Sequence, residues 1–134
     1  MTDQFNPWPE DPTPNNEQHC KRCGLYTHGS RMIWGEGNPS AHIMLILDNP
    51  GERENREGKE YVCGTRQTLH KAAYDVGFNQ DDLYVTYILK RRPKRAYDKP
   101  KTRSICIEHL YEQIENKQPK VICCFGNVAC AIIF

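Results

Sequence analysis

Three short apolar segments constrain the fold of this chain more than any other feature of its sequence. They span residues 43–47, 83–89 and 121–125, and they consist mostly of the aliphatic, β-branched and aromatic residues that are typical of buried strands. Segments with helical patterns alternate with them, and this alternation predicts βαβ units with parallel strands. We therefore expect a three-layer α/β/α fold with a short parallel central sheet.

The helical patterns lie between the predicted strands, in residues 65–76 and 104–116. Apolar residues recur there at intervals of three and four, which places them on one face of a helix. The positions are Leu69, Ala72, Ala73 and Val76 in the first helix, and Ile107, Leu110, Tyr111 and Ile114 in the second. A further helix is expected to begin at Asn127.

The chain has 134 residues, a length that favours a single domain with a core of its own. Residues 1–18 contain four prolines and few aliphatic side chains, so we expect an extended N-terminal arm followed by a domain at 19–134. No segment approaches the roughly 20 apolar residues that cross a membrane, and the N-terminus lacks an apolar signal core. A cytoplasmic protein without membrane contact is expected.

Positive charge is concentrated in residues 90–103, which hold eight lysines and arginines and one acid, whereas the rest of the chain holds ten basic and sixteen acidic residues. Such a block favours contact with a polyanion, although a solvated loop explains it equally well. In a parallel sheet, ligands bind at the carboxyl ends of the strands. Three loops qualify here, at 48–51, 90–103 and 126–127, and they are expected to share one rim.

The seven cysteines are an odd number, and two of them are adjacent, which argues against a framework of disulfides. Spaced cysteines in a reducing compartment more often bind metal. Cys123, Cys124 and Cys130 are interpreted instead as small core residues, since free cysteine is commonly buried.

Six segments of the chain resemble, in order, the motifs of family 4 uracil-DNA glycosylases. Together they extend from His19 to Ala129, and their number and order make chance similarity improbable. They are 20–26 (CKRCGLY), 35–41 (GEGNPSA), 47–51 (LDNPG), 58–62 (GKEYV), 83–93 (LYVTYILKRRP) and 106–129. The resemblance implies a uracil-DNA-glycosylase-like fold that is truncated at the C-terminus, because the chain ends before the family's histidine-containing HPS loop.

The resemblance also implies the residues of an active site. Asp48 stands where the family has the glutamate of its GEAPG motif, and Asn49 makes the turn an Asn-Pro-Gly sequence, so these two residues are the catalytic candidates. The other reading of the segment is an ordinary turn, since its residues are common turn formers. Tyr61 is expected to stack on the base, and Tyr87 replaces the asparagine that reads the base edge. The predicted substrate contacts are Pro50, Gly51, Tyr61, Tyr87 and Asn127.

The basic block is expected to contact DNA phosphates rather than bases, because its charge carries no sequence information. The predicted contacts are Lys90, Arg91, Arg92, Lys94, Arg95, Lys99, Lys101 and Arg103.

The family binds a [4Fe–4S] cluster through four cysteines, and thiolates are the usual ligands of such clusters. Cys20, Cys23 and Cys106 match three of them, whereas Arg91 stands in place of the fourth. His109 follows Cys106 by three residues on the same helix face, so Cys20, Cys23, Cys106 and His109 would form a Cys₃His set suited to zinc. The alternatives are an iron–sulfur cluster, zinc and no metal at all.

These departures leave three hypotheses about function. The first is a DNA-binding glycosylase that excises uracil weakly or has lost that activity. The second is a non-catalytic module on the same fold that binds DNA or protein. The third is a fragment that a partner chain completes, whose signature is an exposed apolar edge near 121–125.

Overall fold

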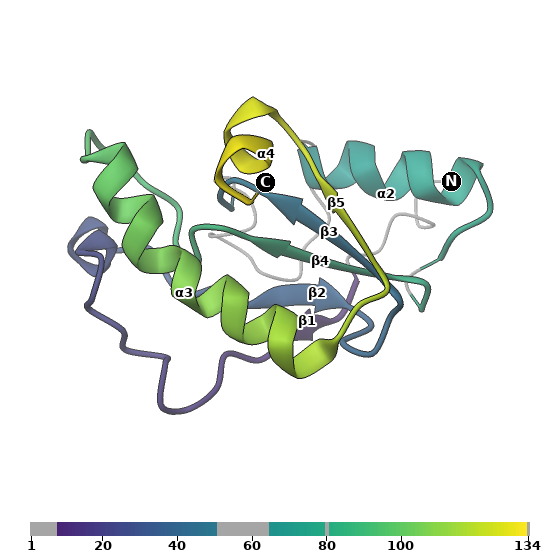
Figure 1. The fold of residues 1–134 in the computed structure, drawn as a ribbon, viewed down its shortest axis with the longest axis horizontal. Coiled ribbons are helices and arrows are strands. Elements are labelled where there is room, and N and C mark those ends of the chain that lie inside the picture. Colours follow the sequence, from purple (N-terminus) through teal and green to yellow (C-terminus); the bar gives the residue numbers. More distant parts are fainter. Residues whose placement is uncertain (1–7, 51–64, 80, 134) are drawn as a thin grey trace.

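The computed structural model describes residues 8–50, 65–79 and 81–133. Within these residues, one sheet has the strand order β1-β2-β4-β3-β5 (Figure 1). β3 pairs in parallel with both β4 and β5, which confirms the predicted parallel core. The strands are β1 (Glu10–Asp11), β2 (Gly35–Gly37), β3 (Ile43–Leu47), β4 (Leu83–Tyr87) and β5 (Val121–Cys124).

The sheet is nevertheless mixed, because β1 and β2 run antiparallel to their neighbours. Glu36 of β2 pairs with Val85 of β4, and Glu10 of β1 pairs with Glu36. The three predicted strands form the parallel part of the sheet, and the two antiparallel strands at this edge were not predicted. Both strands are very short and lack a run of apolar residues, so their strand character depends on pairing, that of β2 with the free side of β4 and that of β1 with β2.

The three α-helices lie where the sequence predicted them, with the start of one moved, whereas the short helix η2 was not predicted. They are η2 (Leu25–His28), α2 (Thr65–Asp75), α3 (Lys99–Lys117) and α4 (Asn127–Ile133). α3 begins before the expected residue 104 because Asp98 caps it, its Oδ1 accepting a hydrogen bond from the backbone N–H of Lys101 at 3.2 Å. The last part of the basic block is thus the first turn of a helix. No helix in the described part of the chain is long and apolar enough to span a membrane.

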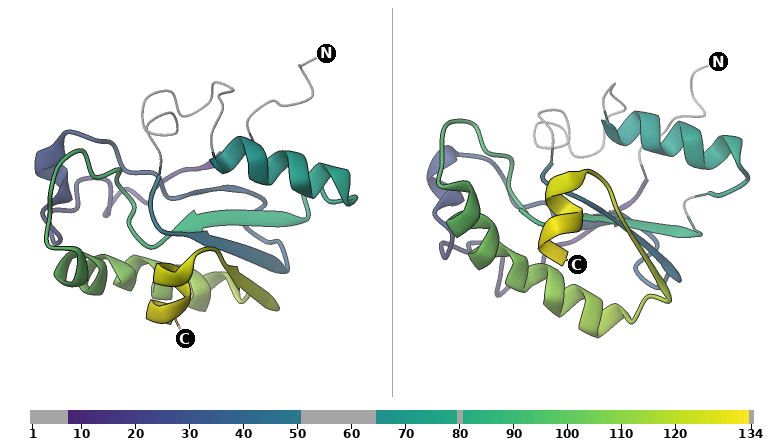
Figure 2. Two further views of the ribbon diagram at one scale, coloured as in Figure 1. Left: turned by 90° about the horizontal axis from the view of Figure 1, so that it is seen from above. Right: turned by 45° about the horizontal axis from the view of Figure 1, so that its top comes forward.

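Helices cover both faces of the sheet, as the three-layer prediction required. Successive residues of β3 point to opposite faces, because side chains alternate along a strand. Met44 and Ile46 pack with residues of α3 and α4, whereas Leu45 and Leu47 pack with Ala73 of α2. The edge-on view in Figure 2 shows α2 on one side and α3 and α4 on the other.

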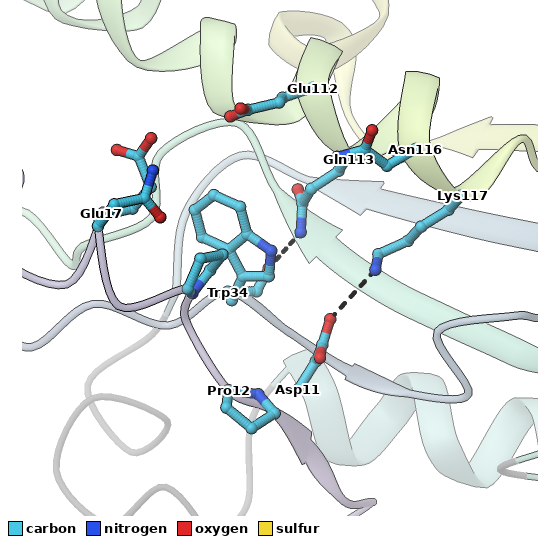
Figure 3. Close-up of a pocket in the computed structure, with 10 residues that line it drawn as sticks. Asp11, Pro12, Glu17, Trp34, Glu112, Gln113, Asn116 and Lys117 are labelled. Atoms are coloured by element: carbon cyan, nitrogen blue, oxygen red, sulfur yellow. Dashed lines mark hydrogen bonds and ion pairs between the residues drawn. The ribbon is translucent and has the colours of Figure 1, made fainter.

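The N-terminal arm is fastened to the body at two places. Trp8 stacks on His70 of α2 with ring centroids 3.8 Å apart. Asp11 accepts a hydrogen bond from the hydroxyl of Tyr84 at 2.7 Å and pairs with Lys117 of α3 at 3.3 Å (Figure 3). The arm therefore contributes to the sheet edge and to the packing of both helical layers.

The opposite edge of the sheet is β5, and much of it faces solvent. Val121 and Phe125 are 49% and 43% exposed. The interpretation of three C-terminal cysteines as core residues is wrong for two of them, since Cys123 and Cys130 are exposed and Cys124 is partly buried. For Cys123 the reason is topological, because β5 has a paired neighbour on one side only, whereas Cys130 lies on an exposed position of α4.

Candidate active site and cysteine cluster

The three loops that follow the parallel strands meet at one rim, as expected. The backbone N–H of Leu89 donates to the carbonyl of Asp48 at 2.9 Å, which joins the loop after β4 to the turn after β3. The N–H of Phe125 donates to the carbonyl of Ile46 at 2.9 Å and brings the loop after β5 beside them. The rim is thus built by backbone pairing of parallel strands.

The turn after β3 presents Asp48 and Asn49, which are both partly buried, and Pro50, which is buried. The side-chain amide of Asn49 donates to the carbonyl of Pro50 at 2.8 Å, so it is held within its own turn. Gly51 and Tyr61, two of the predicted substrate contacts, lie outside the described residues.

Arg103, in the first turns of α3, binds Asp48 with two hydrogen bonds. Its Nε lies 3.1 Å from Oδ1 and its terminal nitrogen lies 2.8 Å from Oδ2, so both oxygens of the carboxylate accept. The side chains are 13% and 29% exposed, respectively. The hydrogen bonds to Asp48 raise the pKa of Arg103. Asp48, a predicted catalytic residue, and Arg103, a predicted DNA contact, thus form an ion pair. The sequence did not reveal this pair, because the two residues belong to separate motifs.

The other rim residues differ sharply in exposure. Tyr87, expected to contact the base, is 1% exposed and packs with Leu47, Val85 and Ala73 beneath α2. A base can therefore reach its ring only after this packing is disturbed. Asn127 is exposed at the start of α4, after Gly126, whose φ of 92° suits a turn that glycine adopts readily.

Lys90 is not a surface residue, and the expectation that it contacts a phosphate was wrong for this structure. It is 2% exposed, and its ammonium lies 2.6 Å from Oγ1 of Thr86, 2.5 Å from the carbonyl of Tyr87 and 2.5 Å from Oε1 of Gln113. Burial lowers its pKa well below the ordinary value. It directly follows the apolar run of β4, a signal that could have placed it inside.

The rest of the basic block divides into held and exposed residues. Arg91 is partly buried and donates to the backbone carbonyls of Ser30 and Gln18. Burial lowers the pKa of Arg91. Arg92 is also partly buried. The exposed members, which remain predicted phosphate contacts, are Lys94, Arg95, Lys99 and Lys101. Of these, Arg95 is also held, because it donates to the backbone carbonyl of Thr27 at 2.6 Å.

Two cysteines of the predicted metal site are joined to each other. Cys23, just before η2, forms a disulfide with Cys106 of α3, with Cα atoms 5.9 Å apart. The argument against disulfides was therefore wrong for this pair. Because 83 residues separate the two cysteines, the bond ties the N-terminal segment to a distant helix.

The other two predicted ligands also meet. Cys20 Sγ lies 3.3 Å from Nε2 of His109, which is 3% exposed. Burial lowers the pKa of His109 to about 4, so the imidazole is neutral at pH 7.

Sequence reasoning missed Glu17, whose carboxylate lies 3.8 Å from Nδ1 of His109, although its three-residue spacing from Cys20 was a signal. Arg22 covers the group and lies 3.1 Å from Glu17 and 3.3 Å from both ring nitrogens.

These residues do not fit a four-cysteine iron–sulfur cluster. Arg91 replaces the fourth cysteine of the motif, and its guanidinium is committed to backbone carbonyls. Two of the remaining thiols are bonded to each other. A different set is closer to a metal site, because ligand atoms of Glu17, Cys20 and His109 all lie within 4.8 Å of one another. Oxygen, sulfur and nitrogen donors of this kind suit zinc.

Comparison with known proteins agrees with this fold. The uracil DNA glycosylase superfamily matches residues 34–134, and the chain belongs to that superfamily. Type-4 uracil-DNA glycosylases of Archaeoglobus fulgidus and Sulfurisphaera tokodaii are each 31% identical to it, over 116 and 117 residues. The alignments cover 86% of this chain but only 58% and 53% of those proteins, so the chain spans about half the length of the curated relatives it matches. A DNA polymerase of Bacillus phage SP01 is 30% identical over 98 residues, which are 71% of this chain and 10% of the polymerase.

Proposed function

We propose that this chain is a DNA-binding domain of the uracil-DNA glycosylase type that excises uracil slowly or not at all. The observation that carries the proposal is the contact between Asp48 and Arg103 at the strand-end rim. The residue in the family's catalytic position lies beside the exposed basic residues of this rim, but its carboxylate is already bound. The geometry thus supports DNA binding more strongly than turnover.

Cleavage of a glycosidic bond requires a positioned water, a stabilised sugar cation and a stabilised leaving base. Asp48 and Asn49 are proposed to serve the first two. Both oxygens of Asp48 accept hydrogen bonds from Arg103, and the amide of Asn49 donates to Pro50. Each group must leave its present partner before it can act, and a charge-stabilising group that is lost typically costs about a hundred- to a thousand-fold in rate.

Base recognition is proposed to be weak for a second reason. Tyr87 stands at the position that the family uses to read the base edge, and it is 1% exposed within an apolar cluster. A site that lacks paired hydrogen bonds to the base discriminates poorly between bases. Pro50, Gly51, Tyr61 and Asn127 remain proposed contacts of the flipped base.

DNA binding is proposed to rest on the exposed residues Lys94, Arg95, Lys99 and Lys101, with Arg92 at their border. Their charges attract phosphates irrespective of sequence. Arg103 can join them only by exchanging Asp48 for a phosphate. The cytoplasmic location expected from the sequence stays a prediction.

A metal, if this chain binds one, is proposed to be a single zinc-type ion held by Glu17, Cys20 and His109. The neutral, buried imidazole supports this assignment, because a ligand histidine must be deprotonated. Reduction of the disulfide would supply Cys23 and Cys106 as further thiolates. The proposed role of such an ion is structural.

A protein partner is proposed for the exposed edge at β5. Val121 and Phe125 are 49% and 43% exposed there, beside an edge strand that could accept a further strand. A strand supplied by another polypeptide would cover this surface.

The test measures binding and excision with one labelled oligonucleotide that contains uracil. We expect binding that weakens steeply with salt, together with slow or absent formation of abasic sites. Replacing Lys94, Arg95, Lys99 and Lys101 by alanine should lower the salt slope by about four, since each phosphate contact contributes about one. Lys71→Ala on α2 is the matched control. Binding that ignores salt would refute the proposal, and binding without any excision would favour the non-catalytic module. Any residual excision should vanish in the double variant Asp48→Ala, Asn49→Ala.

A further inference from the structure

A pocket of about 500 Å³ lies between η2 and the first turns of α3. Its walls come from two segments that are far apart in sequence, residues 21–28 and 97–105. Figures 1 and 2 show η2 at the end of the molecule where α3 begins, which is also the end where the parallel strands finish. The pocket is therefore a neighbour of the Asp48 rim.

The charge of this pocket is positive. Lys21, Arg22 and Lys101 line it, and Asp98 is the single carboxylate among the lining residues. Asp98 is occupied as the cap of α3, where it accepts a hydrogen bond from the backbone of Lys101. A phosphate would meet two exposed lysines here and little opposing charge.

Aromatic rings form the remaining walls. Tyr26 is 41% exposed, and the ammonium of Lys21 lies 5.4 Å from its ring centroid. Tyr97 packs edge-on against His28 with centroids 6.5 Å apart. Burial raises the pKa of Tyr97, and the charges of Arg103 and Asp48 also act on it, which shows that this tyrosine lies close to the candidate catalytic pair. In proteins that bind single strands, aromatic rings stack on bases and nearby positive charges contact phosphates. Tyr26 and Lys21 bring one group of each kind to this pocket.

A second pocket provides a contrast on the same helix. It lies between the N-terminal arm and the later turns of α3, where Trp34 and Gln113 form part of its wall (Figure 3). Its lining includes the carboxylates of Asp11, Glu17 and Glu112 and a single lysine, Lys117, which is paired with Asp11. Aromatic surface is present in both pockets, but only the first has the charge that a phosphate requires.

We propose that the pocket between η2 and α3 binds one nucleotide of the DNA strand next to the base presented at Asp48. The base packs on Tyr26, and its phosphate lies between Lys21 and Lys101. Tyr97 forms the wall toward Asp48. This inference rests on the proposed function, because it assigns a subsite to the same DNA-binding rim.

The test compares two tyrosines of similar exposure. Tyr26→Ala should weaken binding of a labelled single strand about 5- to 100-fold, since a base stacked on an aromatic side chain contributes on that scale. Tyr111→Ala, at a residue that is 46% exposed on α3 and outside the pocket, should leave affinity unchanged. Tyr26→Phe keeps the ring and should retain binding. Lys21→Ala and Lys101→Ala should each lower the salt slope by about one, whereas Lys120→Ala should not.

Circular dichroism and thermal melting establish that each variant is folded, and thymidine monophosphate serves as the free nucleotide in a second arm. If the unaltered chain binds DNA but Tyr26→Ala behaves like Tyr111→Ala, the subsite is wrong while the proposed function stands. If the unaltered chain does not bind DNA, the proposed function fails. Binding of thymidine monophosphate that depends on Tyr26 would then show a pocket for free nucleotides, and the assignment to a DNA strand would be overturned.

Discussion

Arg103 and Arg91 of the basic segment both bind oxygen acceptors, but Arg103 does so beside the candidate catalytic turn and Arg91 does so beside the cysteines. At the rim, Arg103 binds the carboxylate of Asp48, which is 29% exposed. In the cysteine region, the partly buried Arg91 donates to the backbone carbonyls of Ser30 and Gln18. A DNA phosphate can compete for the first guanidinium. The guanidinium of Arg91 instead donates to neutral backbone carbonyls, whose positions the fold determines.

The comparison shows that the two regions depart from the family in different ways. At the rim, Asp48 and Arg103 keep their charges and form an ion pair that is partly exposed. In the cysteine region, an arginine stands at the place of a ligand and two thiols form a bond. We therefore expect changes at Asp48 and Arg103 to affect DNA binding and rate, and changes near Arg91 to affect stability and metal content.

The largest expected effect is the appearance of a cluster in Arg91→Cys. If Arg91 occupies the place of a missing ligand, this variant has the four thiols that a [4Fe–4S] cluster requires. After anaerobic reduction and reconstitution with iron and sulfide, it should show visible charge-transfer absorbance that the unaltered chain lacks. Arg92→Cys is the matched control. A cluster in the unaltered chain would contradict the proposed role of Arg91.

Next in size is the contribution of the disulfide to stability. Cys23→Ser should lower the free energy of unfolding by about 2–4 kcal/mol, because a cross-link over a long loop restricts the unfolded chain. Cys123→Ser, at an exposed free cysteine, should change it by less than about 0.5 kcal/mol. Urea unfolding with and without reductant measures both variants. Equal stability of the two under oxidising conditions would show that the Cys23–Cys106 bond is unimportant.

The two arginines themselves should differ when each is replaced by alanine. Arg91→Ala should cost about 1.5–3 kcal/mol, the range for hydrogen bonds made by charged groups. Arg103→Ala should cost less than about 1 kcal/mol, as is usual for ion pairs near the surface. Urea unfolding at low and high salt distinguishes the two variants, since only the stability lost in Arg103→Ala should become smaller at high salt. The reverse order of costs would remove the distinction between the regions.

Lys90 lies next to Arg91 in sequence and supplies a prediction about pH. Because burial lowers its pKa in the folded chain, the unfolded chain binds the extra proton below pH 10.5. The free energy of unfolding should therefore rise with pH in the range just below the ordinary pKa of lysine, by as much as about 1.4 kcal/mol per pH unit for a single proton. In Lys90→Met this increment should disappear. An identical pH dependence of the two proteins would mean that Lys90 remains charged in the folded state.

The elements predicted correctly from the sequence are those with local apolar patterns. β3, β4 and α2 could be found because their apolar residues recur within one segment. β1 and β2 could not be found, because strands of two and three residues depend on the edge to which they pair.

Partners distant in sequence explain what was missed at the sites. The order of the motifs identified Asp48 as a candidate catalytic residue, and the three-residue spacing after Cys106 identified His109 as a candidate ligand. Each of these signals lies within one short segment. The pairing of Arg103 with Asp48 spans 55 residues, and that of Cys23 with Cys106 spans 83. Lys90 could not be placed inside from its type alone, because its burial depends on the oxygen acceptors that Thr86 and Gln113 provide.

The central claim is that the rim binds DNA while Asp48, held by Arg103, supports little or no excision. The most direct measurement is the single-turnover rate of uracil release from a labelled strand, at a protein concentration where anisotropy shows that strand to be bound. We predict saturable binding and a rate at least about a hundred-fold below that of the Archaeoglobus fulgidus relative under the same conditions. Uracil release by this chain within tenfold of that relative would contradict it.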